Sequence, residues 1–128
     1  MTTVFENHGA FSWTELMTSD VPAARKFYGQ LLGWTFKDMD SSPMPYTVIS
    51  AGEQDIGGIM SVPAQAKGMP PAWGTYVTVK NVDEVAGKVA ALGGKILSEP
   101  HDIPGVGRFA VIQDPQGATL SLITYVPR

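Results

Sequence analysis

The chain has 128 residues, of which 44% are hydrophobic and 16% are charged, and this fits one ordinary domain or two small repeats that share a core. It contains no cysteine, which excludes disulfides, thiolate nucleophiles and cysteine-bound zinc. The formal net charge is −3 and the nine Lys and Arg are scattered, so nucleic acid and membranes are not expected partners, and we expect a cytoplasmic globular protein without a signal peptide.

The first half of the chain predicts a strand, a helix and three further strands. Residues 13–20 are interpreted as a strand, in which alternate side chains share a face, so Trp13, Glu15 and Met17 stand in one row and Leu16 stands in the other. Residues 21–34 predict a helix, because Asp20 can cap its first turn and Gly33 can end it in a left-handed conformation. The apolar stripe of this helix is expected to comprise Ala24, Phe27, Tyr28 and Leu31. Strand-like runs follow at 34–38, 46–50 and 56–62.

The second half repeats this pattern at an offset of 61 residues. The offset carries the helix cap Asp20 onto Asn81, and the glycine stop Gly33 onto Gly94. The stripe of the second helix is expected to comprise Val82, Val85, Val89 and Leu92, and strands are expected at 95–99, 108–114 and 118–126. Two βαβββ repeats are therefore predicted, one over about 9–62 and one over about 73–126, joined by a Pro- and Gly-rich connector at 63–72.

Two such repeats predict an α+β fold. The helix of each repeat shields one face of its strands, and the other face curves around open space. Pairing the repeats would give a partly closed eight-stranded mixed sheet of two half-barrels, with the helices outside and a cleft that suits a small ligand. The side chains expected to face the helices are Leu16, Ile59, Val77, Val79, Leu120 and Leu122. Those expected to face the cleft are Trp13, Glu15, Met17, Gly58, Met60, Gly74, Tyr76, Thr78, Thr119 and Ser121.

Several segments resemble a known family. The segment SDVPAARKFYGQLLGW (19–34) resembles the signature of the vicinal oxygen chelate superfamily, which includes glyoxalase I, extradiol dioxygenases and bleomycin-binding proteins. VDEVAGKVAALGGKIL (82–97) and GRFAVIQDPQGATLSLI (107–123) match it in the second half, and WTELMTSD (13–20) is similar to a glyoxalase-like subgroup. The resemblance spans about 9–126 and implies a homodimer, in which repeats pair within one chain or are exchanged between two.

The resemblance also bears on metal binding. Metalloenzymes of the superfamily carry four ligands, usually His and Glu, on the first and last strand of each repeat. The matching positions here are Trp13, Met60, Gly74 and Ser121. Trp, Met and Gly offer no adequate donor and a neutral Ser is a weak one. We therefore expect no metal site of the family type and no cofactor, unless a divalent ion is held by other residues.

Glu15 is unexpected on the predicted cleft face, because this carboxylate stands between the apolar residues Trp13 and Met17. Three interpretations are open. Glu15 is a structural carboxylate held by Tyr76 or backbone donors, the polar anchor of a ligand pocket, or a general base whose pKa is raised by its apolar neighbours. Burial of a carboxylate without a partner is costly, which favours a functional role.

The segment DIPGVGR (102–108) predicts either a hinged loop, whose Arg108 clamps an anionic ligand, or a plain connection with a solvated Arg108. We expect the protein to bind a small planar or amphipathic organic molecule, a metabolite or an antibiotic, without metal. The alternatives are a glyoxalase-type lyase, isomerase or oxygenase that acts on a small oxygenated substrate, with Glu15 as base or metal ligand, and a non-catalytic self-association module. The expected ligand-binding residues are Trp13, Glu15, Met60, Gly74, Tyr76, Arg108 and Ser121.

Overall fold

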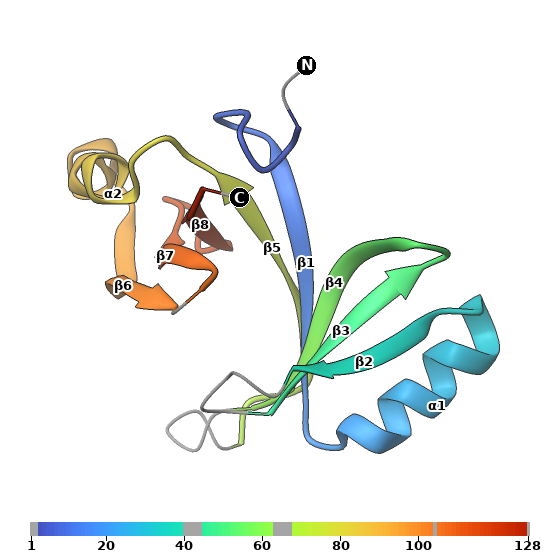
Figure 1. Ribbon diagram of the computed structural model, residues 1–128. Coiled ribbons are helices and arrows are strands. Elements are labelled where there is room, and N and C mark those ends of the chain that lie inside the picture. The colour runs from blue at the N-terminus through green and yellow to red at the C-terminus, as the bar shows by residue number, and fades with distance from the viewer. Residues whose placement is uncertain (1–2, 40–44, 63–67, 104, 128) are drawn as a thin grey trace. The chain divides into compact units, whose positions relative to one another are not determined.

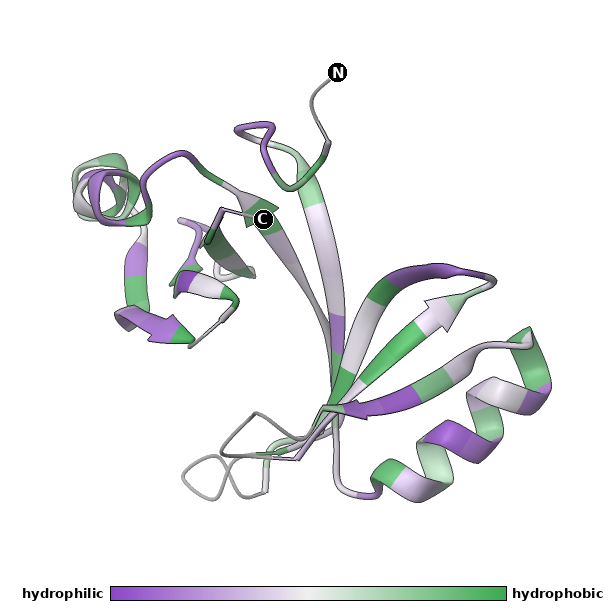
Figure 2. Ribbon diagram, viewed as in Figure 1, coloured by the Kyte–Doolittle hydropathy of each residue, from purple (hydrophilic) through white to green (hydrophobic). Residues whose placement is uncertain are grey.

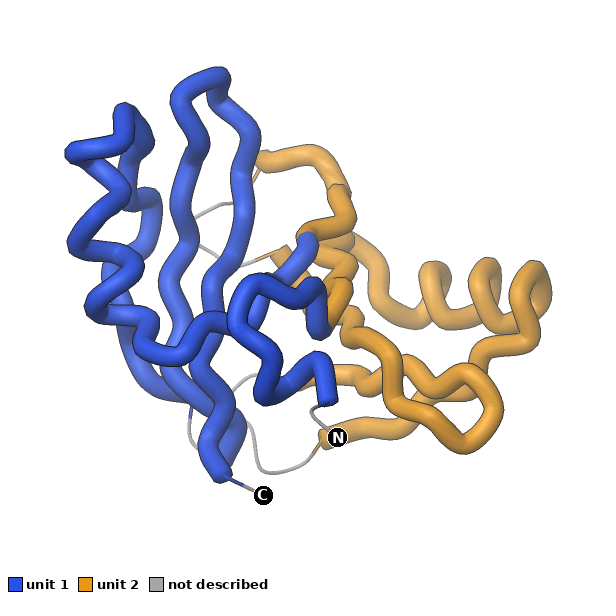
Figure 3. Tube along the Cα trace, turned by 90° about the horizontal axis from the view of Figure 1, so that it is seen from above, with its two compact units in different colours: residues 1–12, 75–128 blue, residues 13–74 orange. Residues whose placement is uncertain are grey.

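The computed structural model describes residues 3–39, 45–62, 68–103 and 105–127. The described residues form an α+β fold with eight strands in a mixed sheet and two α-helices, as the sequence predicts (Figure 1). The chain divides into two compact units (Figure 3): unit 1 comprises residues 1–12 and 75–128, and unit 2 comprises residues 13–74. Neither α-helix in the described ranges is long and apolar enough to cross a membrane.

Unit 2 has the strand order β2-β3-β4-β1, in which β1 runs parallel to β4 and the other neighbours are antiparallel. Helix α1 begins where Asp20 Oδ1 accepts a hydrogen bond from the Ala23 amide at 3.0 Å, and it ends at Gly33, whose φ is 74°. The buried residues Leu16 and Ile59 pack with the α1 residue Ala24. The elements are β1 (Phe11–Thr18), α1 (Val21–Leu32), β2 (Thr35–Met39), β3 (Tyr46–Ala51) and β4 (Gln54–Ser61).

Unit 1 repeats this arrangement with the strand order β5-β8-β7-β6, in which β5 runs parallel to β8. Asn81 Oδ1 accepts a hydrogen bond from the Glu84 amide at 3.1 Å, and the helical segment ends at Gly93, whose φ is 94°. Val82 packs with Leu122 in the core of this unit. The elements are β5 (Ala72–Thr78), α2 (Val82–Val89), a short 3₁₀-helix η2 (Ala90–Leu92), β6 (Lys95–Ile103), β7 (Gly107–Gln113) and β8 (Thr119–Tyr125).

The structure confirms the repeat at the level of single contacts. The two cap side chains accept hydrogen bonds from Ala23 and Glu84, which are themselves 61 residues apart. Leu16 and Ile59 lie in the core of unit 2, and Val77, Val79, Leu120 and Leu122 lie in or against the core of unit 1, as the predicted alternation requires. The connector falls partly at 63–67, outside the described residues.

The predicted apolar stripes of the two helices are too wide. Phe27 is 58% exposed, Leu31 is 63% exposed, and Leu92 in η2 is 76% exposed. Helix α1 instead packs through Val21, Ala24 and Tyr28, so its core-facing stripe is narrow. Figure 2 accordingly shows hydrophobic and hydrophilic bands alternating along α1, with a hydrophilic turn between β3 and β4.

Replacing Asn81 with alanine is expected to lower the free energy of unfolding by about 1 kcal/mol, because the Glu84 amide loses its acceptor. Asn7→Ala is the matched control and should change stability by less than about 0.5 kcal/mol, since Asn7 is exposed and precedes a strand. Urea unfolding of both variants measures the difference. Equal effects of the two substitutions would show that the Asn81 side chain does not cap α2.

Candidate functional site

Strands β1, β3 and β4 present a set of side chains on the face of unit 2 that lies away from α1. Leu16, Ile49 and Ile59 point to the α1 side, so their strand neighbours point to the opposite side. In the strand register, Glu15 lies beside Gly58. Val48 lies on the other side of Gly58. We call this surface the helix-free face; its residues are Trp13, Glu15, Met17, Tyr46, Val48, Gly58 and Met60.

A chain of two hydrogen bonds runs across the helix-free face. The Trp13 indole Nε1–H donates to Tyr46 Oη at 2.9 Å, and the Tyr46 hydroxyl donates to Glu15 Oε2 at 2.8 Å. Glu15 is only 8% exposed, so the hydrogen bond from Tyr46 compensates for part of the cost of its burial. One phenol therefore contacts both the Trp13 indole N–H and one carboxylate oxygen of Glu15, and it fixes their relative position.

Gly58 creates the space for this arrangement. Tyr46 lies on β3 and Glu15 lies on β1, with β4 between them, so the tyrosine ring must cross β4. It crosses at Gly58, where an added Cβ would lie 1.8 Å from Tyr46 Oη and 2.2 Å from Tyr46 Cζ. A side chain at this position is therefore incompatible with the observed position of Tyr46.

Sequence reasoning missed Tyr46 as a site residue, although it predicted the strand at 46–50. Val48 and Ile49 are both apolar and both buried, so the alternation does not tell which face Tyr46 occupies. The signal that was available is Gly58 within a strand, because a glycine there often marks the close approach of another group.

The predicted site residues divide between the two units. Unit 2 contains Trp13, Glu15, Met60 and Gly74. Met60 lies beside Met17 in the register of β1 and β4. Gly74 is exposed. Unit 1 contains Tyr76, Arg108 and Ser121. Tyr76 and Ser121 are paired in the register of β5 and β8, and Tyr76 is only 8% exposed.

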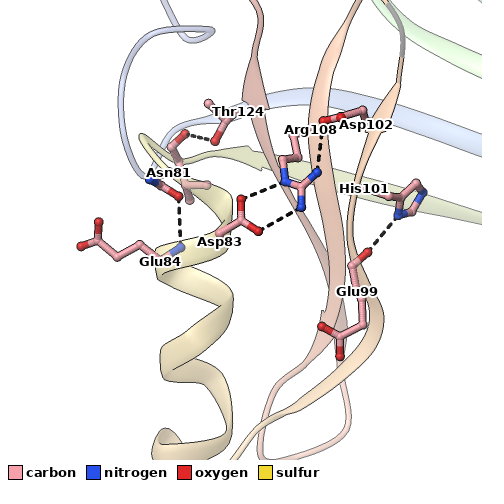
Figure 4. Close-up of polar contacts among 9 residues, drawn as sticks. Asn81, Asp83, Glu84, Glu99, His101, Asp102, Arg108 and Thr124 are labelled. Atoms are coloured by element: carbon pink, nitrogen blue, oxygen red, sulfur yellow. Dashed lines mark hydrogen bonds and ion pairs between the residues drawn. The ribbon is translucent and has the colours of Figure 1, made fainter.

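Arg108 lies in an ion network of unit 1 (Figure 4). Its Nε and Nη2 donate to the two carboxylate oxygens of Asp83 at 2.8 and 3.1 Å, and its Nη1 donates to Asp102 at 3.2 Å. All three guanidinium nitrogens therefore contact carboxylates of this chain. The structure thus pairs Arg108 within the chain, and its contact with an anionic ligand stays a prediction.

The hinged loop predicted at 102–108 is a β-hairpin. Strand β6 continues to Ile103 and β7 begins at Gly107, with Ile103 paired to Gly107 and Asp102 paired to Arg108. The Val106 amide donates to the Ile103 carbonyl at 3.0 Å, which closes the turn around Gly105; residue 104 lies outside the described residues. The hydrogen-bonded strands thus hold most of the segment in place.

The Asp83–Arg108 pair predicts a pH dependence. Hydrogen bonds from Arg108 lower the pKa of the Asp83 carboxyl below its usual range. A lowered folded-state pKa contributes stability that is present above the unfolded-state value, about 3.9, and is lost as the pH falls through the folded-state value. An NMR titration of the Asp83 carboxyl carbon should give a midpoint below the usual value. Arg108→Gln should raise that midpoint, and an unchanged midpoint would contradict the pairing.

The donor chemistry of the family's metal positions does not fit a divalent ion. Trp13, Met60 and Gly74 supply neither an oxygen nor an imidazole from their side chains, and Ser121 supplies one neutral hydroxyl. Among the residues that the structure describes, no three His, Asp or Glu side chains are grouped so that they could hold a metal ion. His101 contacts the Glu99 carbonyl through Nδ1 at 2.9 Å and packs its ring on Phe109.

Comparison with known proteins places this geometry in a family context. The family model of the Glyoxalase/Bleomycin resistance protein/Dioxygenase superfamily matches residues 10–122. The putative glyoxylase CFP32 of Mycobacterium tuberculosis is 39% identical over 127 residues, which cover 98% of this chain and 48% of that protein. The anthracycline biosynthesis protein DnrV of Streptomyces peucetius is 30% identical over 127 residues, with 89% and 46% covered. The chain thus spans about half the length of these curated relatives.

A solved structure supports the fold. Methylmalonyl-CoA epimerase from Mycobacterium tuberculosis superposes with a TM-score of 0.68 at 16% identity, over 93% of this chain and 89% of that chain. The family match covers both βαβββ repeats almost completely. The chain belongs to the glyoxalase/bleomycin resistance protein/dioxygenase superfamily.

Proposed function

We propose that this protein binds a small planar or amphipathic organic molecule on the helix-free face of unit 2, without a resident metal ion. The observation that carries the proposal is the hydrogen-bonded chain of Trp13, Tyr46 and Glu15 at the place where metalloenzymes of the family begin their ligand set. An indole offers a flat stacking surface, and the carboxylate offers an acceptor. Met17 and Met60 add adaptable apolar contacts beside them.

The chemistry of the helix-free face supports a particular class of ligand. Its described side chains include a buried carboxylate and a phenol but no Lys or Arg, so a neutral or cationic ligand with hydroxyl or amine donors is favoured over an anion. A relative named for anthracycline biosynthesis is consistent with this class, because anthracyclines contain a planar aromatic ring system. The cytoplasmic location and the homodimer predicted from the sequence remain part of this proposal.

Calorimetric titration of EDTA-treated protein tests the proposal. The probes are daunorubicin, as an anthracycline, and a panel of planar metabolites and antibiotics. Trp13→Ala should weaken the binding of any probe that binds the wild type at least tenfold, because it removes the stacking surface. Trp73→Ala is the matched control, since Trp73 packs against Tyr28 and Trp34 in the aromatic cluster at α1. Equal losses in the two variants would argue against the helix-free face.

An enzyme is the second candidate function. Glu15 Oε2 lies 2.8 Å from the Tyr46 hydroxyl, so the face holds a carboxylate that can accept a proton next to a phenol that can donate one. A glyoxalase-type lyase, isomerase or oxygenase reaction on a small oxygenated substrate would use Glu15 as base or as a ligand of a metal held by unexpected residues. Loss of turnover in Glu15→Gln at unchanged stability would favour this candidate. Metal analysis of untagged protein distinguishes Glu15 as a base from Glu15 as a metal ligand.

A further inference from the structure

A second candidate site lies in unit 2 at the start of α1. A hollow of about 450 Å³ is bordered there by an apolar wall and by polar side chains. Its volume lies within the usual range of small-molecule sites, which is roughly 300–1,000 Å³. The apolar wall consists of Val21, Pro22 and Pro45. The polar side chains include Arg25, Asp38 and Thr47, of which Thr47 is 4% exposed.

The hollow lies on a different side of the strands from the helix-free face. Thr47 belongs to the same alternating set of β3 as Ile49, which packs in the α1 core, whereas Tyr46 belongs to the opposite set. Val21, Pro22 and Arg25 come from the first turns of α1, and Asp38 comes from β2. This site is therefore separate from the chain of Trp13, Tyr46 and Glu15.

The two arginines of the described residues are engaged to different degrees. Arg108 makes a bidentate contact with Asp83 and a third hydrogen bond to Asp102, and these contacts together involve all three of its guanidinium nitrogens. Within the described ranges, Arg25 donates a single hydrogen bond, from Nη1 to Asp38 Oδ1 at 2.9 Å. A guanidinium has five N–H donors in a rigid fork, so Arg25 keeps the capacity for a carboxylate.

The surroundings of Arg25 hold its guanidinium at the border of the hollow. Its Cζ lies 5.5 Å from the centroid of the Phe36 ring, which gives the cation a second support besides Asp38. The Arg25 side chain is 33% exposed and the Asp38 side chain is 70% exposed. A ligand can therefore reach both charges without separating them.

We propose that this hollow binds a small zwitterion of the α-amino acid type. The carboxylate of the ligand accepts hydrogen bonds from the Arg25 N–H groups that Asp38 does not use, and its ammonium group donates to Asp38. The apolar part of the ligand rests on Val21, Pro22 and Pro45. A simple carboxylate fits this arrangement less well, because Asp38 repels it, and a simple amine fits less well, because Arg25 repels it.

NMR titration of ¹⁵N-labelled protein with L-leucine tests this proposal. Saturable shifts are expected at the amides of Asp38 and Thr47. Two analogues that each lack one charge, 4-methylpentanoate and 3-methylbutylamine, should bind at least tenfold more weakly, because each loses a charge-assisted contact. The proposal is overturned if L-leucine gives no saturable shift up to its solubility limit, or if either analogue binds as well as L-leucine.

Matched arginine variants assign the contact. Arg25→Gln should weaken L-leucine binding at least tenfold, whereas Arg108→Gln should leave it unchanged. Equal weakening by the two substitutions would overturn the assignment to Arg25. Asp38→Asn provides an independent check if Arg25→Gln does not fold, and it should weaken L-leucine more than 4-methylpentanoate. Equal weakening of these two ligands would contradict a contact between the ammonium group and Asp38.

Discussion

Gly58→Ala is expected to lower the free energy of unfolding by about 3 kcal/mol and to weaken any ligand bound on the helix-free face. The new Cβ would lie 1.8 Å from Tyr46 Oη, so the tyrosine ring has to leave its position over β4. The cost combines overpacking, about 1–3 kcal/mol, with the loss of the hydrogen bonds to Trp13 and Glu15, about 1 kcal/mol each. Urea unfolding of the wild type and the variant measures it.

Gly87→Ala is the matched control for Gly58→Ala. Gly87 lies in α2, and a Cβ built there meets nothing within 4 Å. Alanine is favoured over glycine in a helix by up to about 1 kcal/mol, so this variant should be slightly more stable than the wild type. A second control introduces Gly58→Ala into a Tyr46→Ala background. If Gly58→Ala costs as much there as in the wild type, the tyrosine ring is not the group that requires Gly58.

Tyr46→Phe is expected to lower the free energy of unfolding by about 2 kcal/mol. The substitution keeps the ring but removes the hydroxyl that donates to Glu15 at 2.8 Å and accepts from Trp13 at 2.9 Å. Loss of a partner for a buried polar group costs about 1–3 kcal/mol, and Glu15 is 8% exposed. The Trp13 indole N–H resonance should also shift, which unfolding experiments alone would not reveal.

Tyr28→Phe is the control for this substitution, because it removes another Trp–Tyr hydrogen bond of unit 2. Trp73 Nε1 donates to Tyr28 Oη at 3.3 Å, and this pair is exposed. Its loss should cost less than about 1 kcal/mol. A cost for Tyr28→Phe that equals or exceeds the cost for Tyr46→Phe would contradict the role given to the buried hydroxyl.

The fold could be predicted from the sequence because its signals are local and occur twice. The side chains of Asp20 and Asn81 both cap a helix, and glycines with positive φ, Gly33 and Gly93, follow the helical segments. These features need only neighbouring residues, so a single sequence displays them. The alternation of buried residues then followed from the offset between the repeats, because a shift of one residue would expose Leu16.

The candidate site could be predicted only in part, because its decisive contacts are distant in sequence. Trp13 and Glu15 follow from strand alternation, but Tyr46 reaches them across Gly58, and no local pattern shows that crossing. The partner of Arg108 is similarly distant, since Asp83 lies on α2 and Arg108 on β7. The segment 102–108 left open a hinged loop or a plain connection, and the pairing of Ile103 with Gly107 between β6 and β7 could not be predicted from it.

The metal dependence of ligand binding on the helix-free face is the most direct test of a binding site that works without a metal ion. A ligand identified in the titration panel is measured against EDTA-treated protein, against the same protein with added Zn²⁺, Mg²⁺ or Mn²⁺, and against Tyr46→Phe. We expect the same Kd with and without metal, and binding at least tenfold weaker in the variant, because the phenol holds Trp13 and Glu15 in place. Binding that appears only after a divalent ion is added, and that does not change in Tyr46→Phe, would contradict the claim.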